Sequence, residues 1–221
     1  MTWDKMWPIL LLGAQQTLYM TVYASFFAYL VGLPLGILLV VTRKDGILAA
    51  PFFHTVLGVL VNFLRSIPFI ILLAMLIPVT RVVMGKGTGT PDAVVFPLII
   101  SAFPYVARMV ESSLDEVDRG VIEAAQSMGS TPWQIICKVF LPEALPSLVN
   151  GAAICVTVIL GYTAMASAVG GGGLGEIAII RGINQRKYDI MYAASIGLVL
   201  MVQLITVSGT RLTSRIDHRK K

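Results

Sequence analysis

The sequence predicts an all-α integral membrane protein with five transmembrane helices. Its 221 residues are 56% hydrophobic and 13% charged, with a mean hydropathy of +0.81, which is more apolar surface than a soluble core of this size could bury. A spanning helix needs about 20 mainly apolar residues. Five stretches satisfy that requirement: 9–42, 51–79, 93–112, 144–168 and 189–210. A polar segment, at about 118–143, separates the third stretch from the fourth, and we interpret residues 1–221 as one transmembrane domain.

The first two stretches are longer than a straight span requires, and both contain proline. Pro34 lies between Gly32 and Gly36, and Pro68 and Pro78 lie in the second stretch. These residues favour tilted or kinked helices over straight ones. The spacing of Gly32 and Gly36 also permits close helix packing, and we interpret that pair as a packing contact rather than a dimer motif because Pro34 lies between them.

The fourth stretch ends in a run of glycines at 170–173. Their missing side chains allow the following loop to fold back closely. Gly170, Gly172 and Gly175 also match the dinucleotide-binding pattern G-x-G-x-x-G, but no strand precedes them, so we exclude that function. The last turns before the glycines carry three candidate gate residues, for which ordinary helix packing is the alternative: Tyr162, Met165 and Ser167.

The polar segment is predicted to form two short helices. Gly129 suits the left-handed position just after the first helix, and Thr131 with Gln134 matches the capping box at the start of the second. Helical spacing places several apolar side chains on shared faces that another protein could approach. These are Val121, Ala125 and Met128 on the first helix, and Trp133, Ile136, Cys137 and Phe140 on the second.

The order of residues in this segment resembles the EAA loop of ABC importer permeases. Glu-Ala-Ala at 123–125 is followed by Gly129 and, twelve residues later, by Leu141-Pro142. Val139 stands where the family pattern has isoleucine. The motifs RSIPFIILL at 65–73, LPEALPSLVN at 141–150 and GYTAMASAVGGGGLG at 161–175 are similar to methionine-importer permeases in particular.

This resemblance implies a pathway for methionine, of the L and D forms, that works with several partners. They are a second copy of the chain, two ATPase subunits, an extracytoplasmic methionine-binding protein and the surrounding lipid. ATP and Mg would bind to the ATPase, because Thr80 stands where a Walker A loop needs its first glycine before Gly85-Lys86. The resemblance assigns coupling to the ATPase to Glu123, Ala124, Ala125, Gly129, Val139, Leu141 and Pro142. For Glu123, contact with a basic group of the ATPase and capping of its own helix both stay open.

Other function classes fit the sequence less well. The basic residues form no stripe with aromatics, which argues against nucleic acid, and the spans lack charge apart from Arg65, whereas a secondary transporter needs intramembrane acids. The sequence shows no pairing of a nucleophile with a base, which an enzyme active site requires. Two isolated cysteines and two isolated histidines favour no metal site. Within the ABC importers, another amino acid or an osmoprotectant is the alternative substrate.

Arg65 has two interpretations. It lines an inner gate or cavity, or it lies at the cytoplasmic interface with its stem snorkelling and the span beginning near Ile67.

The distribution of basic residues predicts the orientation in the bacterial inner membrane. With the N-terminus outside and the C-terminus inside, ten basic residues lie on the cytoplasmic side and six lie outside. The polar segment is then cytoplasmic, while the loops 81–92 and 170–189 face the binding protein.

Overall fold

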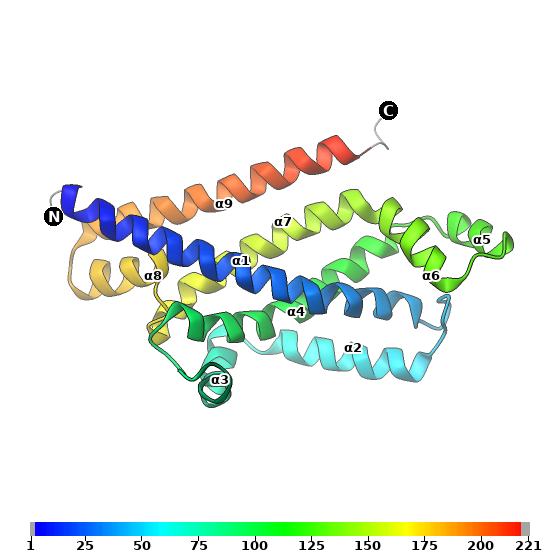
Figure 1. Cartoon of the computed structure of the whole chain (residues 1–221), viewed down its shortest axis with the longest axis horizontal. Helices are drawn as coiled ribbons and strands as arrows, with labels where there is room; N and C mark the ends of the chain where they lie inside the picture. The colour runs from blue at the N-terminus through cyan, green and yellow to red at the C-terminus, as the bar shows by residue number, and fades with distance from the viewer. Residues whose placement is uncertain (1–2, 218–221) are drawn as a thin grey trace. The chain divides into compact units, whose positions relative to one another are not determined.

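The computed structural model describes residues 3–217, and every regular element in that range is helical. The long helices are α1 (Trp3–Val41), α2 (Pro51–Ser66), α3 (Phe69–Met84), α4 (Pro91–Asp115), α7 (Leu141–Met165) and α9 (Tyr188–Ile216) (Figure 1). The short elements are α5 (Arg119–Ser127), α6 (Pro132–Ile135), the π-helix η1 (Ile136–Phe140), the 3-10 helix η2 (Ala166–Val169), α8 (Gly173–Glu176) and the π-helix η3 (Ile177–Asn184). His218 and the basic residues Arg219, Lys220 and Lys221 lie outside the described range.

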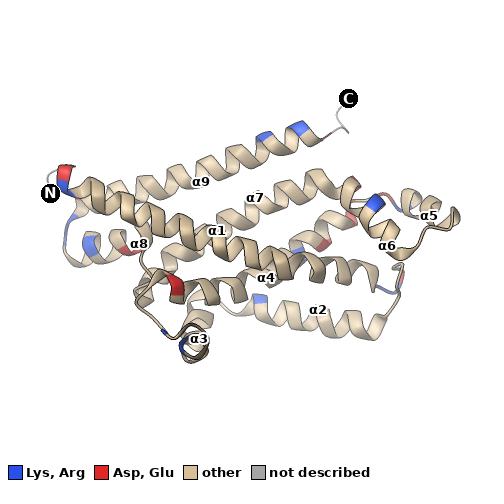
Figure 2. Ribbon diagram, in the orientation of Figure 1, with Lys and Arg blue, Asp and Glu red and all other residues tan. Residues whose placement is uncertain are grey.

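All five apolar stretches are helical. Four helical segments among the described residues are long and apolar enough to cross a membrane: Asp4–Val41, Pro91–Asp115, Pro132–Val169 and Tyr188–Ile216. The helices α2 and α3 pass that test only together, as a pair bent by 102° that forms either one broken span or a re-entrant loop. Figure 2 shows that the charged residues of α1, α7 and α9 lie near the helix ends, so the middle of each helix is uncharged, as a lipid environment favours.

The prolines of the first two stretches have different effects. Pro34 lies inside α1 without ending it, whereas Ile67 and Pro68 separate α2 from α3. Pro68 has no N–H to donate to the end of α2, so the helix stops there and starts again at Phe69. Pro78 is accommodated inside α3.

The chain forms two compact units that share the long helices. The first unit comprises residues 1–28, 67–102 and 156–207, and the second comprises 29–66, 103–155 and 208–221. In the first unit, Met6 and Leu10 of α1 pack with Leu174, Ile177, Ile190 and Ala194. In the second, Leu39 of α1 packs with Val61 of α2 and Ala107 of α4.

Close helix packing in the second unit depends on Gly32 and Gly36. A Cβ atom at Gly32 would lie 2.7 Å from the side chain of Val106, and one at Gly36 would lie 2.6 Å from the carbonyl oxygen of Ala107. Both positions therefore bring α1 against α4 of the same chain, and the interpretation as a packing contact is confirmed.

Candidate coupling surface and ion-pair network

The first half of the polar segment is the helix α5. Asp118 caps it, because its carboxylate accepts a hydrogen bond from the backbone N–H of Gly120 at 2.7 Å. The helix ends at Ser127, and Gly129 then adopts a φ of 78°. That left-handed conformation confirms the turn that the sequence predicts.

The capping box at the start of α6 is also confirmed. The N–H of Gln134 donates to the hydroxyl of Thr131 at 3.4 Å, and the side chain of Gln134 accepts from the N–H of Thr131 at 2.8 Å. The prediction of a separate second helix is wrong, however. The helix continues from α6 through η1 into α7 as one segment, Pro132–Val169, because no residue between Ile135 and Leu141 breaks the hydrogen-bonded path.

The apolar faces of the segment are exposed only in part. Met128 is 79% exposed and Trp133 72% exposed, and Val121 and Cys137 are also exposed. Ala125, Ile136 and Phe140 are buried within the chain, so the prediction that they form part of an exposed face is wrong. The π-helical turn of η1 changes the phase of its side chains relative to an α-helix, so α-helical spacing does not describe that face.

The EAA residues differ in their environment. Glu123 and Ala124 are exposed, whereas Ala125 is buried. Glu123 makes no hydrogen bond or ion pair among the described residues, and the cap of α5 is Asp118. Capping by Glu123 is therefore wrong, which leaves its carboxylate available to another molecule. Near the next helix, Val139 and Leu141 are half-buried and Pro142 is exposed.

Glu123 lies on the wall of a cavity of about 500 Å³ in the second unit. The loop after α1, the end of α4, α5 and η1 all contribute to this wall. Its charged lining residues are Arg43, Asp45, Asp115, Arg119 and Glu123. The lining carries both positively and negatively charged side chains, so this surface is suited to ion pairing.

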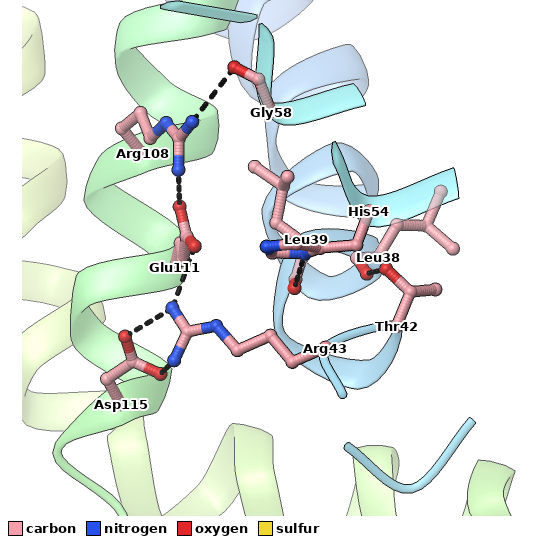
Figure 3. A network of polar contacts seen from close by, with 9 residues as sticks. All are labelled: Leu38, Leu39, Thr42, Arg43, His54, Gly58, Arg108, Glu111 and Asp115. Carbon is pink, nitrogen blue, oxygen red and sulfur yellow. Dashed lines mark hydrogen bonds and ion pairs between the residues drawn. The ribbon is translucent and has the colours of Figure 1, made fainter. Parts of the chain in front are cut away.

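An ion-pair network lies next to this cavity (Figure 3). The guanidinium of Arg43 donates to both oxygens of Asp115 at 2.7 Å and to Glu111 at 2.7 Å. Arg108 donates to the other oxygen of Glu111 at 2.6 Å and to the carbonyl of Gly58 in α2 at 3.0 Å. The side chain of Glu111 is 8% exposed. The positive charges of two arginines balance the negative charges of two carboxylates. The network therefore connects α2 and α4 with the loop that follows α1, and it carries no net charge.

The pKa of Arg43 reflects this contact. Partial burial acts to lower it, but the hydrogen bonds and charges of Asp115 and Glu111 act in the opposite direction and raise it above the ordinary arginine value. Arg43 therefore stays charged at every physiological pH. Beside it, the ring Nδ1 of His54 lies 2.9 Å from the carbonyl oxygen of Leu39, which gives this histidine a local role in holding α2 against α1.

The ion-pair network corrects the expectation that Arg65 is the only charge in the spans. Arg108 and Glu111 both lie inside α4, which extends to Asp115. Their spacing of three residues on one helix face, within an apolar stretch, was the signal in the sequence. Because Glu111 is held between two arginines, it is not the free intramembrane acid that a secondary transporter uses.

The gate candidates of α7 and η2 lie in the first unit. The ring of Tyr162 stacks on that of Phe69 at 4.6 Å between centroids. Met165 is 52% exposed, whereas Ser167 is 4% exposed and its hydroxyl has no partner among the described residues. Arg65 belongs to the second unit, where its guanidinium lies 5.8 Å from the ring centroid of Tyr105. The structure thus brings Tyr162 against Phe69, and Arg65 against Tyr105.

The glycine run folds back as the sequence predicts, and α1 holds it. Gln16 accepts a hydrogen bond from the N–H of Gly173 at 2.8 Å, and Thr17 accepts one from Leu174 at 2.9 Å. A Cβ atom at Gly175 would lie 2.5 Å from the Cα of Ala164. Because this contact runs through backbone atoms and polar groups 157 residues apart, no local sequence pattern points to Gln16 or Thr17.

The region 170–189 is largely helical rather than an open loop. Two acidic residues, Glu176 of this region and Asp92 of α4, have partners within the first unit. Asp92 accepts a hydrogen bond from the hydroxyl of Tyr19 at 2.8 Å, and Glu176 accepts one from the N–H of Gly172 at 2.7 Å.

Comparison with known proteins places the chain among transport permeases. Residues 32–221 match the model of the family described as binding-protein-dependent transport system inner membrane component. A probable D-methionine transport system permease protein MetI from Vibrio cholerae is 46% identical over 211 residues, which are 96% of this chain and 93% of that protein. The D-methionine transport system permease protein MetI of Escherichia coli K12 is 48% identical over 165 residues, 75% of each chain.

Solved structures show the same relationship. A chain of the MetNI methionine ABC transporter, crystallised in inward-facing conformations, matches with a TM-score of 0.95 and 44% identity over 99% of this chain and 100% of that one. A chain of an amino acid ABC transporter, crystallised with histidines, matches with a TM-score of 0.74 at 24% identity, over 98% of this chain and 96% of that one. The second match shows a shared fold.

Proposed function

We propose that this chain, which belongs to the family of binding-protein-dependent transport system inner membrane components, forms the membrane pathway of an ATP-driven importer of methionine. One observation carries the proposal: nearly the whole chain aligns with D-methionine permeases at 42–46% identity. The exposed Glu123, Met128 and Trp133 support it independently, because an unpaired acid beside large apolar side chains suits docking of another protein.

The coupling role falls on the residues of the EAA pattern. The exposed Glu123, Ala124 and Pro142 offer direct contacts to an ATPase subunit. The buried Ala125 and the left-handed Gly129 instead set the shape of the segment. Val139 and Leu141 join the segment to α7. Movement of α5 is then transmitted to α4 and the loop after α1, because both meet α5 around the cavity of about 500 Å³.

The working assembly contains two copies of this chain, two ATPase subunits and one extracytoplasmic binding protein. Five spans are too few to enclose a pathway, and a two-fold axis along the membrane normal supplies the other five. ATP and Mg bind to the ATPase subunits, and this chain has no catalytic role. With α2 and α3 counted as one span, the two ends of the chain lie on opposite sides of the membrane. The excess of basic residues on one side, ten against six, supports an N-terminus outside and a cytoplasmic polar segment between the third and fourth spans.

Met165 is the gate residue that the structure supports best. It is half exposed, and its flexible side chain can form and release an apolar constriction. Tyr162 is held by Phe69, and the unpartnered hydroxyl of Ser167 is available to a polar group once the helix end moves.

Reconstitution tests this function. The chain is purified from its native membrane, its associated subunits are identified, and uptake of labelled methionine into proteoliposomes is measured with and without ATP. Uptake that requires ATP and the binding protein supports the proposal. Absence of an associated ATPase contradicts it, and ATP-dependent uptake of another amino acid or an osmoprotectant, but not methionine, transfers it to that substrate.

A further inference from the structure

Arg65 lies deep along the second apolar stretch. It is fourteen residues after Pro51, the first residue of α2, which corresponds to about 21 Å along the helix axis. The hydrocarbon core of a bilayer is about 30 Å thick. Arg65 also lies at the end of α2, next to Ile67 and Pro68, where α2 and α3 are bent by 102° relative to each other. We build on the interpretation in which Arg65 lines an inner gate or cavity.

The charge of Arg65 is not neutralised within the described part of the chain. Its side chain is exposed and contacts the ring of Tyr105 at 5.8 Å from the centroid, and no described carboxylate lies within ion-pair distance. Arg108 is different, because Glu111 pairs with it. An unpaired cation within an apolar stretch is costly unless an anion or water reaches it, so an anionic partner from outside the chain has a place here.

The surroundings of Arg65 supply a further group for a small zwitterion. Asn62, three residues before Arg65, is exposed on the same side of α2. A guanidinium fork and an amide thus occur together on one face of this helix.

We propose that Arg65, oriented by Tyr105, binds the α-carboxylate of the amino acid as it passes through the pathway. This inference rests on the proposed function. The guanidinium forms a two-pronged ion pair with the carboxylate, and the amide of Asn62, on the same face of α2, is positioned for the ammonium. A site with a single ion pair also releases its ligand readily, as transport requires.

Transport by variants of the complete complex provides the first test. Arg65→Met is expected to reduce methionine uptake per ATP hydrolysed about tenfold, the factor that the loss of one charge-assisted hydrogen bond gives, while the binding protein still stimulates ATP hydrolysis. Arg65→Lys restores part of the uptake. Tyr105→Leu, which removes the ring, lowers uptake. The control is Arg211→Met, an exposed arginine of α9, which leaves uptake unchanged.

Ligand competition provides a second test that does not depend on the stability of variants. The wild-type complex is labelled with photoreactive methionine, and the labelled peptides are identified. Methionine is expected to prevent labelling of α2 and α4, and methioninol, which has no carboxylate, is expected to fail at tenfold higher concentration. Equal competition by methioninol overturns the proposal, as does full uptake in Arg65→Met. Labelling by lipid phosphate analogues at Arg65, with no methionine protection, assigns the residue to lipid instead. If the wild type takes up no methionine, the proposed function itself fails.

Discussion

Glu111 shows how one buried carboxylate can connect three segments of the second unit. It is 8% exposed and accepts hydrogen bonds from Arg43 in the loop after α1 and from Arg108, which also reaches the carbonyl of Gly58 in α2. Removing one member of such a group leaves the others buried without compensation, which costs more than the intact pair contributes. The Nε of Arg108 is already buried without an acceptor among the described residues, so the site has no spare partner.

The variant Glu111→Gln is therefore expected to destabilise the chain by about 3 kcal/mol. Asp115→Asn is the matched control. The side chain of Asp115 is 39% exposed, so its change is expected to cost about 1 kcal/mol or less. Unfolding of the purified chain in mixed detergent micelles measures both values. Equal losses of unfolding free energy in the two variants would show that the burial of Glu111 does not add to stability.

A second residue-scale prediction concerns Glu123, which has no partner within the described chain. Glu123→Gln is expected to leave unfolding unchanged and to lower ATP-dependent uptake about tenfold, because a charge-assisted contact to the ATPase is lost. The control is Glu116→Gln, another exposed acid nearby but outside the EAA pattern. Uptake and stability are measured on the same preparations, and a stability loss in Glu123→Gln without a transport defect argues against a docking role.

Among the elements, the turn between α5 and α6 depends most on a single backbone position. Gly129 has a φ of 78°, and a side chain there costs about 1–2 kcal/mol. Gly129→Ala is expected to loosen the turn and to speed amide hydrogen exchange in α5. Gly161→Ala is the control, because Gly161 lies inside α7 with open space at its Cβ position, where alanine is favourable. Equally slow exchange in both variants would contradict the importance of the turn.

The sequence allows local features of these elements to be predicted, but not features that arise from contacts across the chain. The capping box of Thr131 and Gln134 and the turn at Gly129 depend on a few neighbouring residues, and both are confirmed. The burial of Ile136 and Phe140 depends on a π-helical turn and on tertiary packing, so α-helical spacing gave the wrong face. The network around Glu111 joins residues 68 and 72 positions apart. No periodic pattern reports such contacts.

For the whole molecule, the orientation in the membrane is testable with the two native cysteines. Cys137 is exposed on the polar segment and Cys155 is buried inside α7. A membrane-impermeant maleimide is expected to label Cys137 in inverted vesicles stripped of peripheral proteins, and not in spheroplasts. Cys155 serves as the unreactive internal control. Labelling of Cys137 from the outside would reverse the proposed topology.

The caps of the polar segment have a consequence for how such transporters diversify. Asp118, Thr131 and Gln134 satisfy the backbone of α5 and α6 locally, so the segment keeps its shape without help from Met128 or Trp133, which point outward. These two positions can mutate without repacking the interior. Under the proposed function these two positions contact the ATPase, so a lineage can adjust which ATPase it accepts by changing surface chemistry alone, while its membrane-embedded part stays as it is.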